Sequence, residues 1–309
     1  MIHISNGPIN RAQKVVIYGV EGIGKTTLAA QAPDPLFIDT EGGTSHLNVK
    51  RTQPPEDWQQ LLDMVREVAV TPGLCKSLVI DTADWAEAMA IDAICKKYKQ
   101  TGLEAFGYGK GYTYLGEEFA KLLAACDGVI RAGVNVIIIA HARQRRVELP
   151  DETGGFDVWG LKLSKQCAPM LKEWADALLF ANYKTFVVQV DANHNKAQGG
   201  KRVIYTTHSP TRDAKNRHGL ADELDMEYSA ISPIFTEVKA DDPVQRLRDA
   251  MTAYACTEAD LVRFINKKQF FGPVDAVDQL PDKFIREWVL PNLDQIIDKI
   301  ISDPEYQPF

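Results

Sequence analysis

The stretch that decides the fold lies near the N-terminus and reads Val15-Val16-Ile17-Tyr18-Gly19-Val20-Glu21-Gly22-Ile23-Gly24-Lys25-Thr26. Its first four residues are apolar or aromatic and predict a buried strand. The segment from Gly19 to Thr26 matches G-x-x-x-x-G-K-[ST] at every fixed position, and Thr27-Leu28-Ala29-Ala30-Gln31 is typical of a helix. A strand, a glycine-rich loop and a helix in this order predict a phosphate-binding loop.

Each part of this loop has a role in binding a nucleoside triphosphate. Glycines let the backbone curl so that its N–H groups point at the phosphates, and the helix N-terminus adds partial positive charge. We expect Gly19–Thr27 to hold ATP, Lys25 to reach the β and γ phosphates, and the Thr26 hydroxyl to ligate Mg²⁺. A glycine-rich turn without a ligand is the alternative interpretation.

Two acidic residues complete the predicted catalytic site. Leu78-Val79-Ile80-Asp81 fits a Walker B strand, whose final carboxylate would hold Mg²⁺ through water beside the loop. Many ATPases carry a glutamate directly after this aspartate, but Thr82 stands here. The predicted base is therefore Glu41, just past the strand that ends at Asp39, at the ligand-bearing edge of an α/β sheet. A solvated loop glutamate is the alternative.

Apolar runs alternate with helical patterns through about the first 235 residues. This alternation predicts an α/β fold with a mostly parallel central sheet. The late runs lie too close together for intervening helices and predict antiparallel strands at one edge. The predicted strands are Lys14–Tyr18, Pro35–Asp39, Ser77–Asp81, Val134–Ala140, Ala177–Ala181, Thr185–Val190 and Arg202–Thr206.

The pattern changes after Thr236, which predicts a core at residues 1–238 and a small helical region at 239–309. Asp242-Pro243 makes a break, and helical spacing of apolar residues follows it. Thr257-Glu258-Ala259-Asp260 predicts a capping box that opens a helix. A last helix is expected through Leu293–Ile301. This region carries no catalytic motif that we recognise.

Composition excludes several classes of protein. The 309 residues are 45% hydrophobic and 25% charged, as in globular proteins, and no apolar run approaches the ~18–20 residues that cross a membrane. The first residues lack the layout of a signal peptide. Five scattered cysteines, with no Cys-x-x-Cys pair, argue against disulfides or zinc and for a reducing compartment. The expected location is the cytoplasm, that of a bacterial host if the chain is phage-encoded.

Charge is distributed unevenly along the chain. The formal net charge is −7, yet residues 141–220 contain 13 Lys and Arg against 8 Asp and Glu. A local basic patch decides nucleic-acid binding more than the total does. The charge pattern alone is equally compatible with a solvated surface of mixed sign.

The order of the motifs resembles the RecA-type recombinase core, in particular the RecA-like ATPases of bacteriophages grouped with single-strand annealing proteins. The resemblance covers roughly residues 10–235 and implies a RecA-like P-loop NTPase core. It implies that Phe37-Ile38-Asp39-Thr40-Glu41 supplies the catalytic glutamate. It also places His141 where the family has a glutamine that senses the γ-phosphate. This departure leaves a simple cap of the strand Val136–Ala140 as the alternative role.

The same resemblance implies two loops that contact DNA. One would be the basic loop with Arg143, Arg145 and Arg146, followed by Asp151-Glu152-Thr153-Gly154-Gly155, which suits contact with phosphates. The other would lie at Phe106–Tyr112, where Tyr108, Lys110 and Tyr112 are suited to stacking on unpaired bases. A plain flexible loop is the alternative for this second segment.

Lys215 and Arg217 resemble a Lys-x-Arg element of RecA-like proteins and replicative ring helicases. In those proteins both cations reach the γ-phosphate of a neighbouring subunit. Alternate residues of a strand share a face, so Lys215 and Arg217 can point at one anion. The resemblance therefore implies a homo-oligomer with Arg217 as an arginine finger. A solvated basic turn is the alternative.

These features favour a DNA-dependent ATPase that assembles on single-stranded DNA in recombination, annealing or replication. Two alternatives stay open. One is a nucleotide-switched interaction module whose helical region docks a single-strand binding protein. The other is a ring helicase or translocase. A GTPase is disfavoured because Asn195-Lys196-Ala197-Gln198 lacks the aspartate that recognises guanine.

Overall fold

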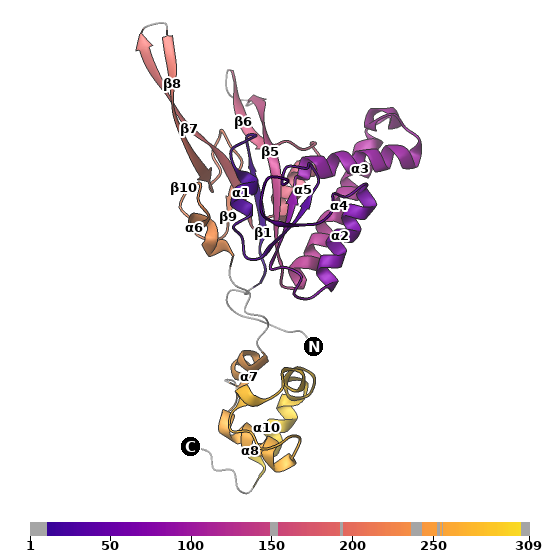
Figure 1. Ribbon diagram of the computed structural model, residues 1–309, viewed down its shortest axis with the longest axis vertical. Coiled ribbons are helices and arrows are strands. Elements are labelled where there is room, and N and C mark those ends of the chain that lie inside the picture. The colour runs from indigo at the N-terminus through magenta and orange to yellow at the C-terminus, as the bar shows by residue number, and fades with distance from the viewer. Residues whose placement is uncertain are drawn as a thin grey trace. The chain divides into compact units, whose positions relative to one another are not determined.

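The computed structural model describes residues 11–148, 154–191, 194–235, 243–251, 254 and 256–303. The chain divides into two compact units, Met1–Val238 and Lys239–Phe309, and each has its own apolar core. Figure 1 shows a sheet with flanking helices in the first unit and helices in the second. None of the described helices combines the length and apolarity that a membrane crossing requires.

A mostly parallel sheet forms the centre of the first unit. In the described residues its strands run in the order β10, β8, β7, β1, β5, β4, β2, β3, with β6 on β5 and β9 on β7. All neighbouring pairs from β7 to β3 are parallel, and those that involve β6, β8, β9 and β10 are antiparallel. The strands are β1 (Lys14–Gly19), β2 (Pro35–Asp39), β3 (Lys50–Arg51), β4 (Ser77–Asp81), β5 (Asn135–Glu148), β6 (Gly155–Leu161), β7 (Ala177–Asp191), β8 (His194–Tyr205), β9 (Lys215–Asn216) and β10 (Glu223–Asp225). The expected fold class is thus confirmed.

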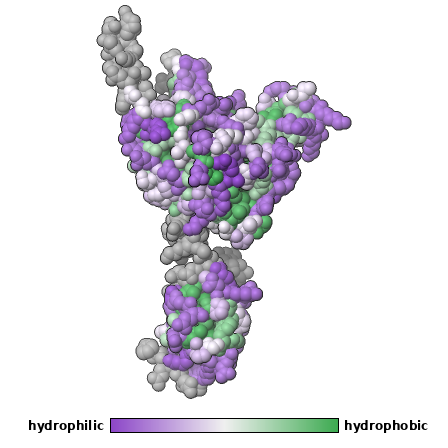
Figure 2. Space-filling model, viewed as in Figure 1, coloured by the Kyte–Doolittle hydropathy of each residue, from purple (hydrophilic) through white to green (hydrophobic). Residues whose placement is uncertain are grey.

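Helices cover both faces of this sheet because its central strands are apolar on both sides. Val16 and Tyr18 of β1 join the core beneath α2, α3, α4 and α5, whereas Val15 and Ile17 join the core beneath α1 and α6. The helices are α1 (Lys25–Ala29), α2 (Trp58–Val70), α3 (Ala83–Tyr98), η1 (Leu103–Phe106), α4 (Lys110–Arg131), α5 (Cys167–Trp174), α6 (Tyr228–Ile231) and η2 (Ser232–Ile234). The visible face of this unit is mostly hydrophilic (Figure 2).

Two strands run further than their apolar runs predicted. The strand predicted to end at Ala140 continues to Glu148, because residues 142–148 pair antiparallel with β6. The runs Ala177–Ala181 and Thr185–Val190 belong to one strand, β7, which pairs with β8 along most of its length. The ends of these strands form hairpins that extend past the parallel sheet (Figure 1).

The second unit consists of short helices around its own core. Thr257 accepts a hydrogen bond from the Asp260 amide, and the Asp260 carboxylate accepts one from the Thr257 amide, so the predicted capping box is confirmed. The core includes Leu247, Leu261 and Ile297. The helices are α7 (Pro243–Met251), α8 (Glu258–Lys268), η3 (Val277–Gln279), α9 (Asp282–Phe284), η4 (Ile285–Val289), η5 (Leu290–Asn292) and α10 (Leu293–Ile301).

Candidate nucleotide site

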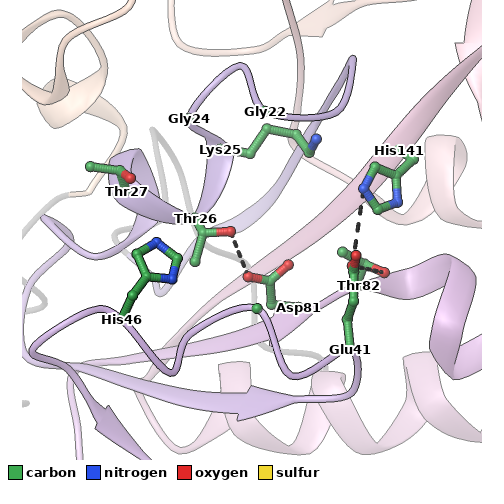
Figure 3. Close-up of a pocket in the computed structure, with 11 residues that line it drawn as sticks. Gly22, Gly24, Lys25, Thr26, Thr27, Glu41, His46, Asp81, Thr82 and His141 are labelled. Atoms are coloured by element: carbon green, nitrogen blue, oxygen red, sulfur yellow. Dashed lines mark hydrogen bonds and ion pairs between the residues drawn. The ribbon is translucent and has the colours of Figure 1, made fainter.

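A cavity of about 250 Å³ opens at the carboxyl ends of the central parallel strands. The phosphate loop follows β1, and the register aligns Gly19 with His141 of β5 and Ala181 of β7. Figure 3 shows side chains from the loop, β4, β5 and the segment after β2 converging on this space. The lining residues are Gly22, Gly24, Lys25, Thr26, Thr27, Glu41, Gly43, His46, Asp81, Thr82 and His141.

Two glycines of the loop are required by the backbone. A Cβ on Gly19 would lie 2.2 Å from the carbonyl oxygen of Ala181, so the neighbouring strand leaves no room for a side chain. Gly24 precedes α1 with φ 105°, a conformation that other residues adopt only with strain. The fixed glycines of the motif therefore serve local geometry that holds the loop curled.

Lys25 is held inside the loop. Its ammonium donates hydrogen bonds to the carbonyl oxygens of Gly19 at 3.1 Å and Val20 at 3.0 Å. Burial lowers the pKa of Lys25, although Asp81 and nearby acidic residues act in the opposite direction. The lysine is thus positioned among carboxylates at the place where the motif expects phosphate oxygens.

Thr26 and Asp81 provide oxygen atoms suited to Mg²⁺. The Thr26 hydroxyl donates to Asp81 Oδ2 at 2.7 Å, so both oxygens lie within reach of one small cation. Burial, with further contributions from Asp39 and Glu41, raises the pKa of Asp81 to about 6, and a cation would favour its ionised form. No group of three or more His, Cys, Asp or Glu in the described residues could hold a metal. Mg²⁺ ordinarily keeps several water ligands and binds substrate phosphates, with only one or two carboxylates from the protein.

Asp39 organises the loop that carries Glu41. Its carboxylate accepts hydrogen bonds from the amides of Glu41, Gly42, Gly43 and Thr44 and from the Thr44 hydroxyl. Burial would raise the pKa of Asp39, but these hydrogen bonds outweigh it and hold the pKa below its usual value. Glu41 itself is exposed, and its Oε2 lies 3.5 Å from the Thr82 hydroxyl. The glutamate is thus presented to the cavity by a loop with satisfied backbone groups.

His141 is held by an acidic partner that the sequence did not reveal. The Asp84 carboxylate in the first turn of α3 accepts from the His141 amide at 3.0 Å and lies 2.7 Å from His141 Nδ1. The opposite ring atom, Nε2, lies 4.0 Å from Glu41 Oε2 (Figure 3). The hydrogen bond to Asp84 raises the pKa of His141, although burial and Lys25 act in the opposite direction. When the imidazole is protonated, it presents an Nε2–H to the cavity.

Lys215 and Arg217 do not line this cavity. Lys215 is on β9, where it pairs with Leu178 of β7, and its ammonium donates to the carbonyl oxygens of Lys172 and Glu173. The Arg217 guanidinium donates to Asp176 Oδ1 at 3.1 Å. Because Asp176 precedes β7 while the phosphate loop follows β1, the two cations lie at the opposite end of the strands from the loop.

The segments predicted as DNA loops are more regular than expected. Lys110 and Tyr112 belong to the first turn of α4, and the Tyr112 hydroxyl donates to Glu104, so this part of the predicted loop is helix. Tyr108 is fully exposed, as a base-stacking residue would have to be. The helix begins directly after Gly109, whose φ is positive.

The segment predicted as a basic loop is also a regular element, because its arginines lie on a strand. Arg143, Arg145 and Arg146 lie on β5, in the hairpin with β6, and all three are exposed. Pairing with β6 satisfies the backbone of this polar segment, which propensity alone would place in a loop. The residues Asp151, Glu152 and Thr153 of the same prediction lie outside the described residues.

Sequence reasoning missed three residues near the cavity. Asp84 follows Asp81 by three positions but shows no pattern that links it to His141, which lies 57 residues away. Arg202 of β8 donates to the carbonyl oxygen of Ile23 at 3.2 Å and lies beside Gly24. His46 lines the cavity from the loop after β2. All three positions depend on tertiary packing, and nothing in their local sequence marks them.

Comparison with known families is consistent with this geometry. The model of the AAA domain family AAA_24 matches residues 11–218. The chain belongs to this family. The AAA domain of this chain therefore contains the phosphate loop, both acidic candidates and His141, and its family is one of P-loop ATPases.

Two further similarities are more limited. The AAA domain protein is 25% identical over 139 residues to the "SPbeta prophage-derived uncharacterized protein YorG" of Bacillus subtilis (strain 168). That alignment covers 42% of this chain and 41% of the Bacillus protein. A RadB recombinase structure is similar with a TM-score of 0.35 and 15% identity, over 63% of this chain and 81% of the other. The fold assignment rests on the strand order itself.

Proposed function

We propose that this AAA domain protein hydrolyses ATP with Mg²⁺ and that single-stranded DNA stimulates the turnover. The convergence of Lys25, Thr26, Asp81, Glu41 and His141 on one cavity supports the hydrolysis. Exposed arginines on the strand that carries His141 support the coupling to DNA. The prophage origin of the similar Bacillus protein supports a phage setting, in the cytoplasm of a bacterial host.

Each residue has a distinct part in this proposal. Lys25 and the loop amides bind the triphosphate, and Thr26 and Asp81 hold Mg²⁺, which neutralises phosphate charge. Glu41 accepts the proton of the attacking water or orients it. His141 donates a hydrogen bond from Nε2 to the γ-phosphate. Loss of the γ-phosphate would break the hydrogen bond of His141. A shift of His141 would then move the arginines on the same strand and weaken their contact with DNA.

We further propose that the site is completed by a second copy of the chain. Lys215 and Arg217 lie away from the cavity of their own chain, so a role at a γ-phosphate would require the cavity of a neighbour. In a head-to-tail assembly the two cations would stabilise charge that develops in the transition state. Arg217 would exchange its contact with Asp176 for the phosphate.

The first test compares ATP turnover with and without single-stranded DNA, in the wild type and two variants. Lys25→Ala should abolish nucleotide binding in calorimetry. Glu41→Gln should retain binding but lower turnover by on the order of 10²-fold or more, as expected for loss of a general base. Wild-type turnover that DNA does not raise would contradict the coupling. Unchanged turnover in Glu41→Gln would refute its assignment as the base.

A further inference from the structure

A second cavity, of about 180 Å³, lies between the β5–β6 hairpin and α5. Four cationic side chains border it: Arg143 and Arg145 come from β5, Lys165 precedes α5, and Lys172 lies on α5. The one acidic residue among those that line it is Asp213. We call this cavity the basic groove. Its charged residues come from three segments that are distant in sequence.

The charges of the basic groove do not balance. Lys172 lies 2.9 Å from Asp213 Oδ2, and Arg145 lies 4.0 Å from the same oxygen, so the buried carboxylate is already paired. Arg143 and Lys165 are exposed and have no carboxylate partner among the described residues. Four cations against one carboxylate leave an excess of positive charge that attracts a polyanion.

The spacing of the arginines suits a ligand with repeated anionic groups. Side chains two residues apart on a strand lie on one face, roughly 6–7 Å from each other. Arg143 and Arg145 therefore present two planar guanidinium groups in a row, which fit phosphate oxygens with paired hydrogen bonds. Arg146 falls on the other face of the hairpin and is not among the groove residues.

We propose that the basic groove binds the phosphodiester backbone of a single-stranded nucleic acid. The inference rests on the proposed DNA-coupled ATPase. It adds Lys165 and Lys172 to the side chains that contact the nucleic acid, and it removes Arg146 from them. Contact with the phosphodiester backbone does not depend on the base sequence. The ligand is thus any single strand that presents successive phosphates.

The groove adjoins the nucleotide cavity through one strand. His141 lines that cavity, and Arg143, two residues further along β5, lines the groove. The His141 carbonyl oxygen accepts from the Lys162 amide at 2.8 Å, which joins β5 to the segment that leads to Lys165. A shift of His141 would therefore move groove residues on both of its walls.

The test measures binding of a fluorescently labelled single-stranded oligonucleotide by anisotropy, with full-length protein and a series of salt concentrations. The double variant Arg143→Ala/Lys165→Ala should weaken binding by on the order of tenfold or more at low salt. It should also reduce the slope of log affinity against log salt by about 0.7 per lost contact. Arg146→Ala, which removes a charge from the other face of the same hairpin, should have a smaller effect.

Thermal unfolding midpoints near that of the wild type would show that the variants fold. Oligonucleotides of DNA and RNA separate the two sources of phosphodiester, and both should lose affinity in the double variant. If DNA binds but the double variant matches Arg146→Ala, the groove assignment is overturned while the DNA-coupled ATPase stands. If polyglutamate binds the groove and neither nucleic acid does, the ligand is an acidic protein segment and the proposal is wrong.

Discussion

At the scale of single residues, the nucleotide cavity depends on how each charged group is paired. Asp39 and Asp81 end adjacent parallel strands, yet their environments differ. Asp39 accepts five hydrogen bonds and stays ionised, whereas burial and neighbouring carboxylates raise the pKa of Asp81 to about 6. One aspartate therefore organises the loop, and the other is available to a cation. Asp81 is also the residue at the Walker B position, where a carboxylate that binds Mg²⁺ is expected.

If His141 senses the γ-phosphate as proposed, turnover should be sensitive to pH. Its raised pKa, due first to the hydrogen bond with Asp84 and then to the Asp84 and Glu41 charges, keeps the ring protonated above its ordinary pKa of about 6.5. Turnover should decline as pH rises through this raised pKa, because the neutral ring no longer reliably donates from Nε2. Asp84→Asn should move the decline to lower pH, and His141→Gln should remove it. Stopped-time ATPase assays across pH measure this, and an unmoved decline in Asp84→Asn would contradict the pairing.

The same pair affects stability in a defined direction. A folded-state pKa above the unfolded value means that the protonated histidine stabilises the folded chain. That contribution is fully present below pH ~6.5 and is lost as pH rises through the folded-state pKa. Denaturant unfolding of the wild type and Asp84→Asn at two pH values should show a difference that is larger at the lower pH.

At the scale of elements, the loop after β2 depends on the carboxylate of Asp39. Asp39→Ala would leave the amides of Glu41–Thr44 and the Thr44 hydroxyl without their acceptor, at a cost on the order of 3 kcal/mol. The melting temperature should fall by several degrees, and turnover should fall with it because Glu41 loses its position. Differential scanning calorimetry measures the first effect. Asp63→Ala, at an exposed acid on α2, is the control and should change neither.

Elements that are buried on both faces were predictable, and those that leave the sheet were not. The predicted bounds Pro35–Asp39 and Ser77–Asp81 agree with β2 and β4, because a continuous apolar run coincides with the buried part of a central strand. The continuation of β5 to Glu148 has a polar sequence. It is a strand only because β6 supplies the partner, and no local pattern contains that information.

At the scale of the whole molecule, the proposed action of Lys215 and Arg217 on a neighbour predicts activity shared between copies. Arg217→Ala should lower turnover by on the order of 10³-fold, as for loss of an arginine finger. Mixed one to one with Lys25→Ala, it should recover activity, because about a quarter of head-to-tail interfaces would then combine an intact loop with an intact arginine. ATPase assays of the mixture measure this. Absence of recovery would show that Arg217 does not act on a neighbour.

The second unit has a core of its own, which predicts that it is dispensable for nucleotide binding. A chain without residues 239–309 should bind ATP with wild-type affinity in calorimetry. If this unit docks a single-strand binding protein, the shortened chain should fail to bind that protein in pull-down assays but should still bind DNA. Loss of ATP binding would instead mean that the cavity depends on the helical unit.

The sequence by itself determined the phosphate loop, the two acidic strand ends and the α/β class. These features are local, since a strand, a turn and a helix with fixed residues are enough to specify the chemistry of a phosphate site. Only the tertiary structure decided the partner of His141, the hairpin conformation of the arginines and the basic groove. The residues involved come from segments far apart in the chain, and the tertiary fold brings α3 against β5 and places α5 beside the β5–β6 hairpin.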